Sequence, residues 1–159
     1  MKLAQTIMVL GVASVALTAN NALAEKCNGY AMTKSMKPIL MRETPDGVKV
    51  NWYTSEGIFF VANPQNHPAN GVNRICAGGL QIAPDGKSGS GTGSCTYADM
   101  DGDVYHLIWN STFGKGTWKI VGGTGKFEKF TGNGTYKLAK RYQNSLGTST
   151  WEGECNLAK

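Results

Sequence analysis

The sequence contains few of the residues, and none of the compact motifs, on which most enzymes and metal sites depend. Histidine occurs only twice, at His67 and His106, and no two of the four cysteines are close neighbours, which argues against a zinc site. A G-x-S-x-G segment is missing, and no local pattern brings a serine, a histidine and a carboxylate together. These absences leave a hydrolase unsupported and predict that the cysteines do not bind a metal ion.

Two segments match known ligand-binding loops only in part. Carboxylates alternate along Asp99–Asp103 as in a calcium loop, but Val104 and Asn110 occupy the positions of the EF-hand glycine and glutamate. In Gly122–Lys126, Ile120 stands where a phosphate-binding loop needs its first glycine. We therefore interpret the first segment as a turn with solvated carboxylates, and the second as a turn whose glycines supply positive φ.

Long hydrophobic runs are also missing, with one exception at the N-terminus. An apolar run extends from Ile7 to Leu17, after Lys2 and before Ala22-Leu23-Ala24, which is the pattern of a secretory signal peptide and its cleavage site. The run is too short to cross a bilayer, so an uncleaved anchor is the weaker alternative. Residues 1–24 are predicted to be a cleaved signal peptide. Residues 25–159 then form one domain without a membrane span, in the periplasm or secreted.

All four cysteines follow the predicted cleavage site, and an even number in an exported chain indicates two disulfides. Asp85-Gly86 predicts a two-residue hairpin turn, which pairs positions whose numbers sum to 171, and Cys76 and Cys95 meet this condition. That register places them on a hydrogen-bonded pair, where the Cα atoms lie farther apart, unless a bulge intervenes. By elimination, Cys27 joins Cys155 and connects the two ends of the domain.

The rest of the pattern is that of β-strands, with no helical period. Short alternating or apolar segments recur at even spacing between turns, which predicts about eight strands in a barrel or a sandwich. The expected strands lie near residues 48–53, 58–61, 72–83, 88–98, 105–109, 117–121, 131–139 and 147–156.

Asp101-Gly102 predicts a second two-residue turn, which sets the register of the next hairpin. This register pairs Tyr97 with His106 on one face. On the other face it places large side chains opposite small ones, as the curved wall of a barrel requires. The pairs are Tyr105 with Ala98, Leu107 with Thr96, and Trp109 with Ser94.

Alternation within the strands also predicts which side chains point inward. The candidates for ligand binding in the lumen are Trp52, Tyr105, Leu107, Trp109, Trp118 and Tyr136. Two interpretations are open for this largely aromatic set. Its members fill a packed core, as they do in most small barrels, or they line an apolar pocket that is open at one mouth.

Glycine is abundant and unevenly placed, since fifteen of the 21 glycines lie between Gly71 and Gly134. The absence of a Gly-X-Y period excludes collagen, and the high content disfavours a helix bundle. Concentrated in the hairpins, these glycines favour a barrel because they permit the bends and close approaches that let a sheet curl shut.

The formal net charge of +5 is spread along the chain without a nucleic-acid-binding signature, so we expect no nucleic-acid partner.

The segment from Gly114 to Tyr136, which contains VGGTGKF and then Gly132-Asn133-Gly134, resembles the allene oxide cyclase and dirigent superfamily. The preceding Gly91–Cys95 and Asp99–Asp103 are similar to bacterial members without an assigned role. The resemblance covers roughly residues 72–136 and implies an eight-stranded antiparallel barrel with a hydrophobic lumen, no cofactor and frequent homo-oligomers. Characterised relatives cyclise an unstable fatty-acid epoxide or steer the coupling of phenolic radicals, mainly by restricting conformation inside the barrel.

These patterns together predict an exported all-β protein, a single eight-stranded antiparallel β-barrel stabilised by two disulfides, that binds a small, mostly apolar or phenolic molecule in its lumen. One alternative is a cofactor-free cyclase or isomerase of the allene oxide cyclase or dirigent type, although no catalytic residue is assigned. The other is a structural or interaction protein with a filled barrel. Polar side chains that converge in the lumen favour catalysis, and the absence of a pocket favours the structural protein.

Overall fold

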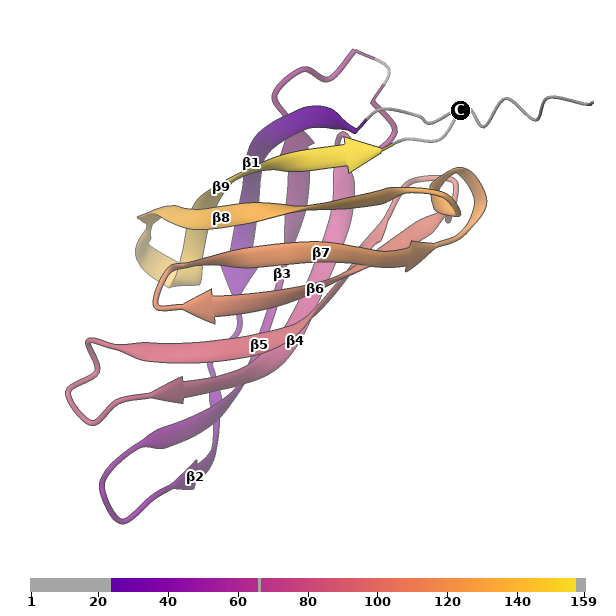
Figure 1. Ribbon diagram of the computed structural model, residues 1–159. Coiled ribbons are helices and arrows are strands. Elements are labelled where there is room, and N and C mark those ends of the chain that lie inside the picture. The colour runs from indigo at the N-terminus through magenta and orange to yellow at the C-terminus, as the bar shows by residue number, and fades with distance from the viewer. Residues whose placement is uncertain (1–23, 66, 157–159) are drawn as a thin grey trace, which may run out of the picture.

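The computed structural model describes residues 24–65 and 67–156, which form nine antiparallel strands and two short 3₁₀ helices (Figure 1). The predicted signal peptide, apart from Ala24, lies outside these residues. Within them, no helix is long and apolar enough to cross a bilayer. The elements are β1 (Glu25–Ser35), β2 (Ile39–Glu43), β3 (Lys49–Val61), β4 (Val72–Ile82), β5 (Gly89–Ala98), β6 (Val104–Thr112), β7 (Lys115–Gly123), η1 (Gly125–Phe127), β8 (Thr131–Arg141), η2 (Gln143–Ser145) and β9 (Leu146–Asn156).

Eight of the strands close into a barrel, as predicted. Neighbouring strands from β3 to β9 pair in chain order, β9 pairs with β1, and β1 returns to pair with β3. The long strand β3 serves two neighbours on one edge, because Ser55–Val61 pair with β1 and Lys49–Trp52 pair with β2. The extra strand β2 therefore continues β1 beyond Pro38 and extends the wall at one end of the barrel (Figure 1).

The β4–β5 hairpin has the predicted register, and both predicted disulfides are present. Cys76 pairs with Cys95, and Cys27 is bonded to Cys155. The turn, however, spans four residues, because Pro84 has no N–H and the closing hydrogen bond runs from Ala83 N to the Ser88 carbonyl, 3.0 Å. This change of turn moves the Cys76–Cys95 pair to a position without cross-strand hydrogen bonds, where the two Cα atoms are 4.0 Å apart.

The register of the β5–β6 hairpin differs by one residue from the predicted register. Its turn has three central residues, Met100–Gly102, instead of two, and Gly102 adopts a φ of +88°. The Asp99 carboxylate favours this longer turn because it accepts the backbone N–H groups of Asp101, at 2.9 Å, and Asp103, at 3.0 Å. The predicted two-residue turn at Asp101-Gly102 is therefore wrong.

The shifted register changes which side chains meet on both faces of this hairpin. Tyr97 pairs with Tyr105 inside the barrel, where the two rings stack with centroids 4.5 Å apart. His106 pairs with Thr96 on the outside, with Nδ1 and Oγ1 3.0 Å apart. The predicted pairing of Tyr97 with His106 is wrong, and so are the three predicted large–small pairs.

Large side chains do lie opposite small ones, but the small residue is glycine. Trp109 and Trp118 pair with each other across β6 and β7, and each indole covers a Gly–Gly pair on the two strands beyond it. A Cβ atom added to Gly93 would be 2.6 Å from the Trp109 ring, and one added to Gly134 would be 2.7 Å from the Trp118 ring. The row across six strands consists of Gly78, Gly93, Trp109, Trp118, Gly134 and Gly153.

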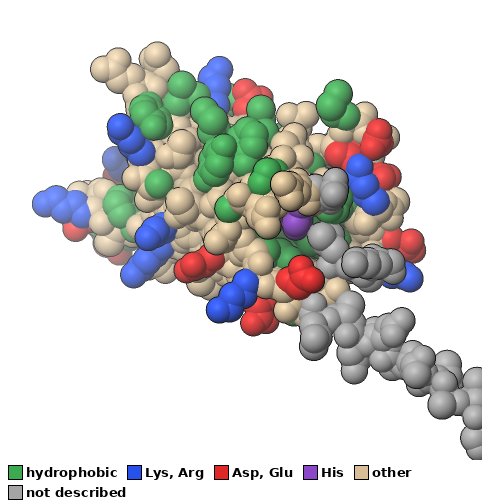
Figure 2. All heavy atoms as spheres, turned by 90° about the horizontal axis from the view of Figure 1, so that it is seen from above, with side chains coloured by type: hydrophobic (Ala, Val, Ile, Leu, Met, Phe, Trp, Pro, Cys, Tyr) green, Lys and Arg blue, Asp and Glu red, His purple; other side chains and the backbone are tan. Residues whose placement is uncertain are grey.

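The two ends of the barrel differ. At the end that we call the packed end, residues 62–71 and 124–130 cover the opening, and Phe127 is fully buried. Seen from above Figure 1, charged side chains lie mostly around the outline, and hydrophobic side chains gather in patches between them (Figure 2). The opposite end, here called the open end, carries the short turns at 84–87, 113–114 and 142–145, and Phe113 there is 55% exposed.

Candidate functional site

A cavity of about 450 Å³ runs inside the barrel. Each of the eight barrel strands contributes to its lining, which is mainly aromatic and aliphatic. At the packed end the cavity stops at Phe130 and His67, and at the open end it reaches Phe113, Leu138 and Arg141. Because these last residues are exposed or nearly so, the cavity opens to solvent there. Its volume and apolar lining are those of a small-molecule site.

Five of the six predicted lumen residues line this cavity, and one does not. Trp52 is 45% exposed on the outside of β3. The inward residues of that strand are the neighbouring Asn51, Tyr53 and Ser55, so the polar side of the alternation faces the lumen. The predicted inward orientation of Trp52 is therefore wrong. The residues that line the cavity as predicted are Tyr105, Leu107, Trp109, Trp118 and Tyr136.

Arg74 is a lumen residue that the sequence reasoning missed. It lies on the inward face of β4 between Val72 and Cys76, and it lines the cavity. Its Nη2 is 2.9 Å from the sulfur of Cys76 and 3.5 Å from Oγ of Ser55, and its Nε is buried without a hydrogen-bond partner. The signal was its spacing, two residues from a cysteine that had to face its partner across the hairpin.

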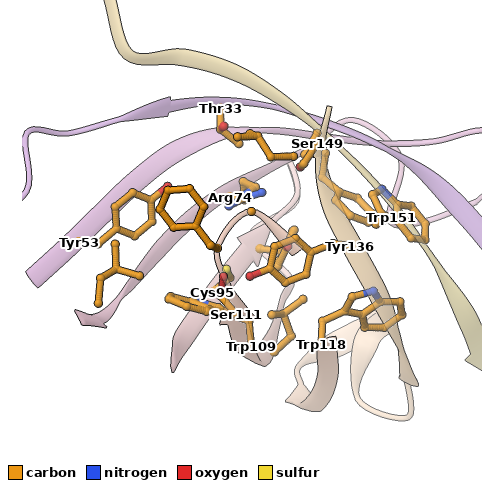
Figure 3. A pocket seen from close by; sticks show the side chains of 18 of the residues that line it. Thr33, Tyr53, Arg74, Cys95, Trp109, Ser111, Trp118, Tyr136, Ser149 and Trp151 are labelled. Carbon is orange, nitrogen blue, oxygen red and sulfur yellow. The ribbon is translucent and has the colours of Figure 1, made fainter. Parts of the chain in front are cut away.

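Side chains with hydroxyl groups share the lumen with Arg74. Figure 3 shows its side chain between those of Tyr53 and Tyr136. The Tyr53 hydroxyl lies 3.1 Å from Oγ of Ser35, and Tyr136 forms a hydrogen bond with Ser111. Burial raises the pKa of Tyr136, although the Ser111 hydrogen bond and the Arg74 charge act in the opposite direction. Tyr136 is therefore a neutral hydrogen-bonding group at physiological pH, not a phenolate.

Buried tyrosines also close the lumen at the packed end. Tyr105 contacts Tyr97, Phe127 and Phe130, with ring centroids 4.5 to 5.1 Å apart. Burial raises the pKa of Tyr97, and it raises that of Tyr105 well above the ordinary value, while the Arg74 charge lowers both by less. Both phenols stay protonated at neutral pH, so neither neutralises Arg74.

The two histidines lie in different parts of the molecule. His67 reaches the packed end of the cavity, and its Nδ1 accepts the backbone N–H of Ala69 at 3.2 Å. Burial lowers the pKa of His67, and the Glu25 charge opposes this shift more weakly. His67 is thus neutral at pH 7 with Nδ1 as acceptor, whereas His106 lies on the outer surface.

The segment Asp99–Asp103 forms a turn, as interpreted. In Gly122–Lys126 the interpretation is correct only for Gly125, which has a φ of +52° and begins η1, because Gly122 and Gly123 end β7 without a positive φ. The two segments contact each other. Lys126 of η1 forms ion pairs with Asp99 at 2.5 Å and with Asp101 at 3.0 Å. Its hydrogen bond lowers the pKa of Asp99, and the two carboxylates raise the pKa of Lys126. In residues 24–65 and 67–156, no group of three His, Cys, Asp or Glu side chains is arranged to hold a metal ion.

No protein-family model matches the chain, and no curated protein matches it. Among solved structures, it is similar to the pterocarpan synthase dirigent protein GePTS1, with a TM-score of 0.46, 10% identity and coverage of 86% of this chain and 87% of that one. It is also similar to the pterocarpan synthase dirigent protein PsPTS1, with a TM-score of 0.47, 12% identity and coverage of 85% of this chain and 97% of that one.

Proposed function

We propose that the protein binds a small, mostly apolar molecule in the lumen of its barrel, without a cofactor. The observation that carries this proposal is the cavity of about 450 Å³, open at one end and lined from all eight barrel strands. A barrel with a purely structural role is expected to fill its interior at the density of a protein core. The free volume therefore supports binding over a filled barrel.

The chemistry of the wall supports the same proposal. Trp109, Trp118 and Tyr136 present large, rigid apolar surfaces to the cavity, which give contact area at a small cost in conformational entropy. The glycines beneath the two indoles hold the rings close to the wall and so leave the centre free. A few hydroxyl groups and Arg74 remain to orient the bound molecule.

Ligand screening with a matched pair of variants tests the proposal. Intrinsic tryptophan fluorescence and native mass spectrometry are applied to the purified protein with a library of lipids and phenols. Leu107→Trp places an indole in the cavity, whereas Ile108→Trp places it on the outside of the same strand. We expect binding to the wild type and to Ile108→Trp, but not to Leu107→Trp. No binding to the wild type, or equal binding to both variants, would contradict the proposal.

Export to the periplasm or to the medium is part of the proposal. The two disulfides support it, because disulfides persist in oxidising compartments, and so does the signal-like pattern at residues 1–24. The test is N-terminal sequencing of the protein recovered from the native host. A mature chain that begins at Glu25 is expected, and recovery of the uncleaved chain in the cytoplasm would contradict export.

A cofactor-free cyclase or isomerase is the second candidate, favoured by the polar groups that converge on the lumen. Tyr53, Tyr136 and Arg74 lie together there (Figure 3), and such groups can orient a substrate or stabilise developing charge. Products of each bound compound are sought by mass spectrometry. Tyr136→Phe should lower turnover more than affinity if the protein is an enzyme.

A homo-oligomer stays a prediction, and sedimentation velocity of the purified protein would test it.

A further inference from the structure

Arg74 is a cationic side chain inside the barrel without an anionic partner. Among the described residues, the ion pairs are those of Lys126 with Asp99 and Asp101, and the residues lining the cavity include Arg74 and Arg141 but no Asp or Glu. Placing a charge in a largely apolar interior is unfavourable unless an opposite charge compensates it. The lumen therefore carries an uncompensated positive charge.

The hydrogen-bonding capacity of Arg74 is also largely unused. A guanidinium has five N–H donors in a planar fork. Its contacts are the Cys76 sulfur, a weak acceptor at 2.9 Å, and the Ser55 hydroxyl, at the long distance of 3.5 Å. The Nε–H group has no acceptor. A carboxylate presents two oxygens in the plane that matches this fork.

Aromatic side chains occupy the next level of the cavity toward the open end. Arg74 contacts the sulfur of Cys76, and Gly78, two residues further along β4, lies beneath the Trp109 ring. Two residues of a strand span about 7 Å, and Tyr53 meets Trp109 edge to face at the same level, with centroids 6.5 Å apart. A ligand whose acid group meets Arg74 would thus place a short aromatic body against these rings.

We propose that the lumen binds aromatic monocarboxylates, with the carboxylate held by Arg74 and the ring packed against Tyr53 and Trp109. The proposal rests on the lumen being a binding site and adds the class of ligand. Burial raises the pKa values of Tyr97, Tyr105 and Tyr136, so none of these three side chains forms a phenolate that competes for the guanidinium. The mostly apolar wall favours a monoanion over a phosphate, which would need further cationic partners.

The test compares cinnamate with cinnamamide, a neutral molecule of the same shape, by isothermal titration calorimetry. In the wild type, cinnamate is expected to bind about 10- to 100-fold more tightly, as for a charge-assisted hydrogen bond. Arg74→Gln should remove this preference and leave the affinity for cinnamamide unchanged. Arg74→Lys, which keeps the charge, should retain part of it, and Arg141→Gln at the open end should retain most of it.

Two further measurements test the pairing of the carboxylate with Arg74. Arg74→Gln removes an uncompensated charge, so its unfolding temperature is expected to equal or exceed that of the wild type. In the wild type, the affinity for cinnamate should decrease when the pH is lowered below the pKa of cinnamic acid. The affinity for cinnamamide should stay constant over the same pH range. A constant cinnamate affinity across that range would overturn the pairing with Arg74.

The outcomes separate this proposal from the one on which it rests. If cinnamate and cinnamamide bind equally and Arg74→Gln changes neither affinity, the lumen remains a binding site and the role of Arg74 is overturned. If decanoate binds as tightly as cinnamate and also depends on Arg74, the aromatic class is overturned and the carboxylate site stands. If no compound of the library binds, the proposed function fails, and the ligand class fails with it.

Discussion

The packed end and the open end of the barrel are built from the same eight strands, yet one is closed and the other is hollow. At the packed end, the connection at 124–130 lays Phe127 and Phe130 over the lumen, where both are buried. At the open end, the turns at 84–87 and 113–114 are too short to reach across it. The strands therefore make the wall, while the length and hydrophobicity of the connections decide which end of the lumen is open to solvent.

Removal of the Cys27–Cys155 disulfide tests the packed end with the largest expected effect. This disulfide closes a loop with a sequence separation of 128, against 19 for Cys76–Cys95. On the chain-entropy model, the Cys27→Ser/Cys155→Ser variant should lose about 5 kcal/mol of unfolding free energy, and Cys76→Ser/Cys95→Ser about 3 kcal/mol. Urea unfolding of both double variants measures the difference. A larger loss for the Cys76 and Cys95 variant would contradict the expectation.

Truncation of one phenylalanine at each end should separate the two ends further. Phe127→Ala removes a fully buried ring that packs against Tyr105 and Phe130, and should cost about 3–5 kcal/mol. Phe113→Asn removes an exposed ring from a turn residue with a φ of +29°, and should change stability by about 0.5 kcal/mol or less. Both are measured by urea unfolding, and similar losses would mean that the open end is packed as well.

The glycine row between the two ends can be tested with two neighbouring residues. A Cβ atom at Gly78 would lie 2.3 Å from the Thr92 carbonyl oxygen and 2.5 Å from the Trp109 ring, whereas one at Gly79 would meet nothing within 4 Å. Gly78→Ala should therefore cost about 1–3 kcal/mol, and Gly79→Ala should be neutral or slightly stabilising. Thermal unfolding decides, and equal effects would show that the indole is free to move away.

The ion pair at the packed end should give the smallest effect, seen as a dependence on pH. The Lys126 hydrogen bond holds the pKa of Asp99 below its ordinary value of 3.8, so the unfolded chain binds this proton more readily than the folded one. The stabilisation is complete above the ordinary value and is lost as the pH falls through the lower folded-state value. Because the partners Lys126 and Asp101 are exposed to solvent, the loss is small.

The measurement is the urea midpoint of the wild type and of Asp99→Asn between about pH 6 and about pH 2. The variant should lose less stability than the wild type over this range. Asp85→Asn is the control at the open end, since that carboxylate accepts the Lys87 N–H and, in the described part of the chain, pairs with no cation. A pH dependence of Asp99→Asn identical to that of the wild type would exclude a role for the ion pair.

Local patterns predicted most of the strands, but they divided β3 into two, missed β1 and placed Trp52 on the wrong face. The segments 48–53 and 58–61 were expected as separate strands, but they belong to the single strand β3, because Ser55 and Gly57 interrupt the apolar pattern without interrupting the pairing. β1 had no clear alternation and was not expected as a strand. At Trp52, hydrophobicity indicated the inward face, while the barrel places the polar face of β3 inside.

The sequence by itself determined the all-β class, the two disulfides and the inward orientation of Trp109, Trp118 and Tyr136, because alternation and hairpin register act over a few residues. Only the tertiary structure decided that β1 closes the barrel on β3, that one end stays open, and that Arg74 has no counter-ion in the lumen. These features depend on which distant strands meet and on what remains unpaired among them. No local pattern contains that information, and the opening and the charge of the cavity both depend on it.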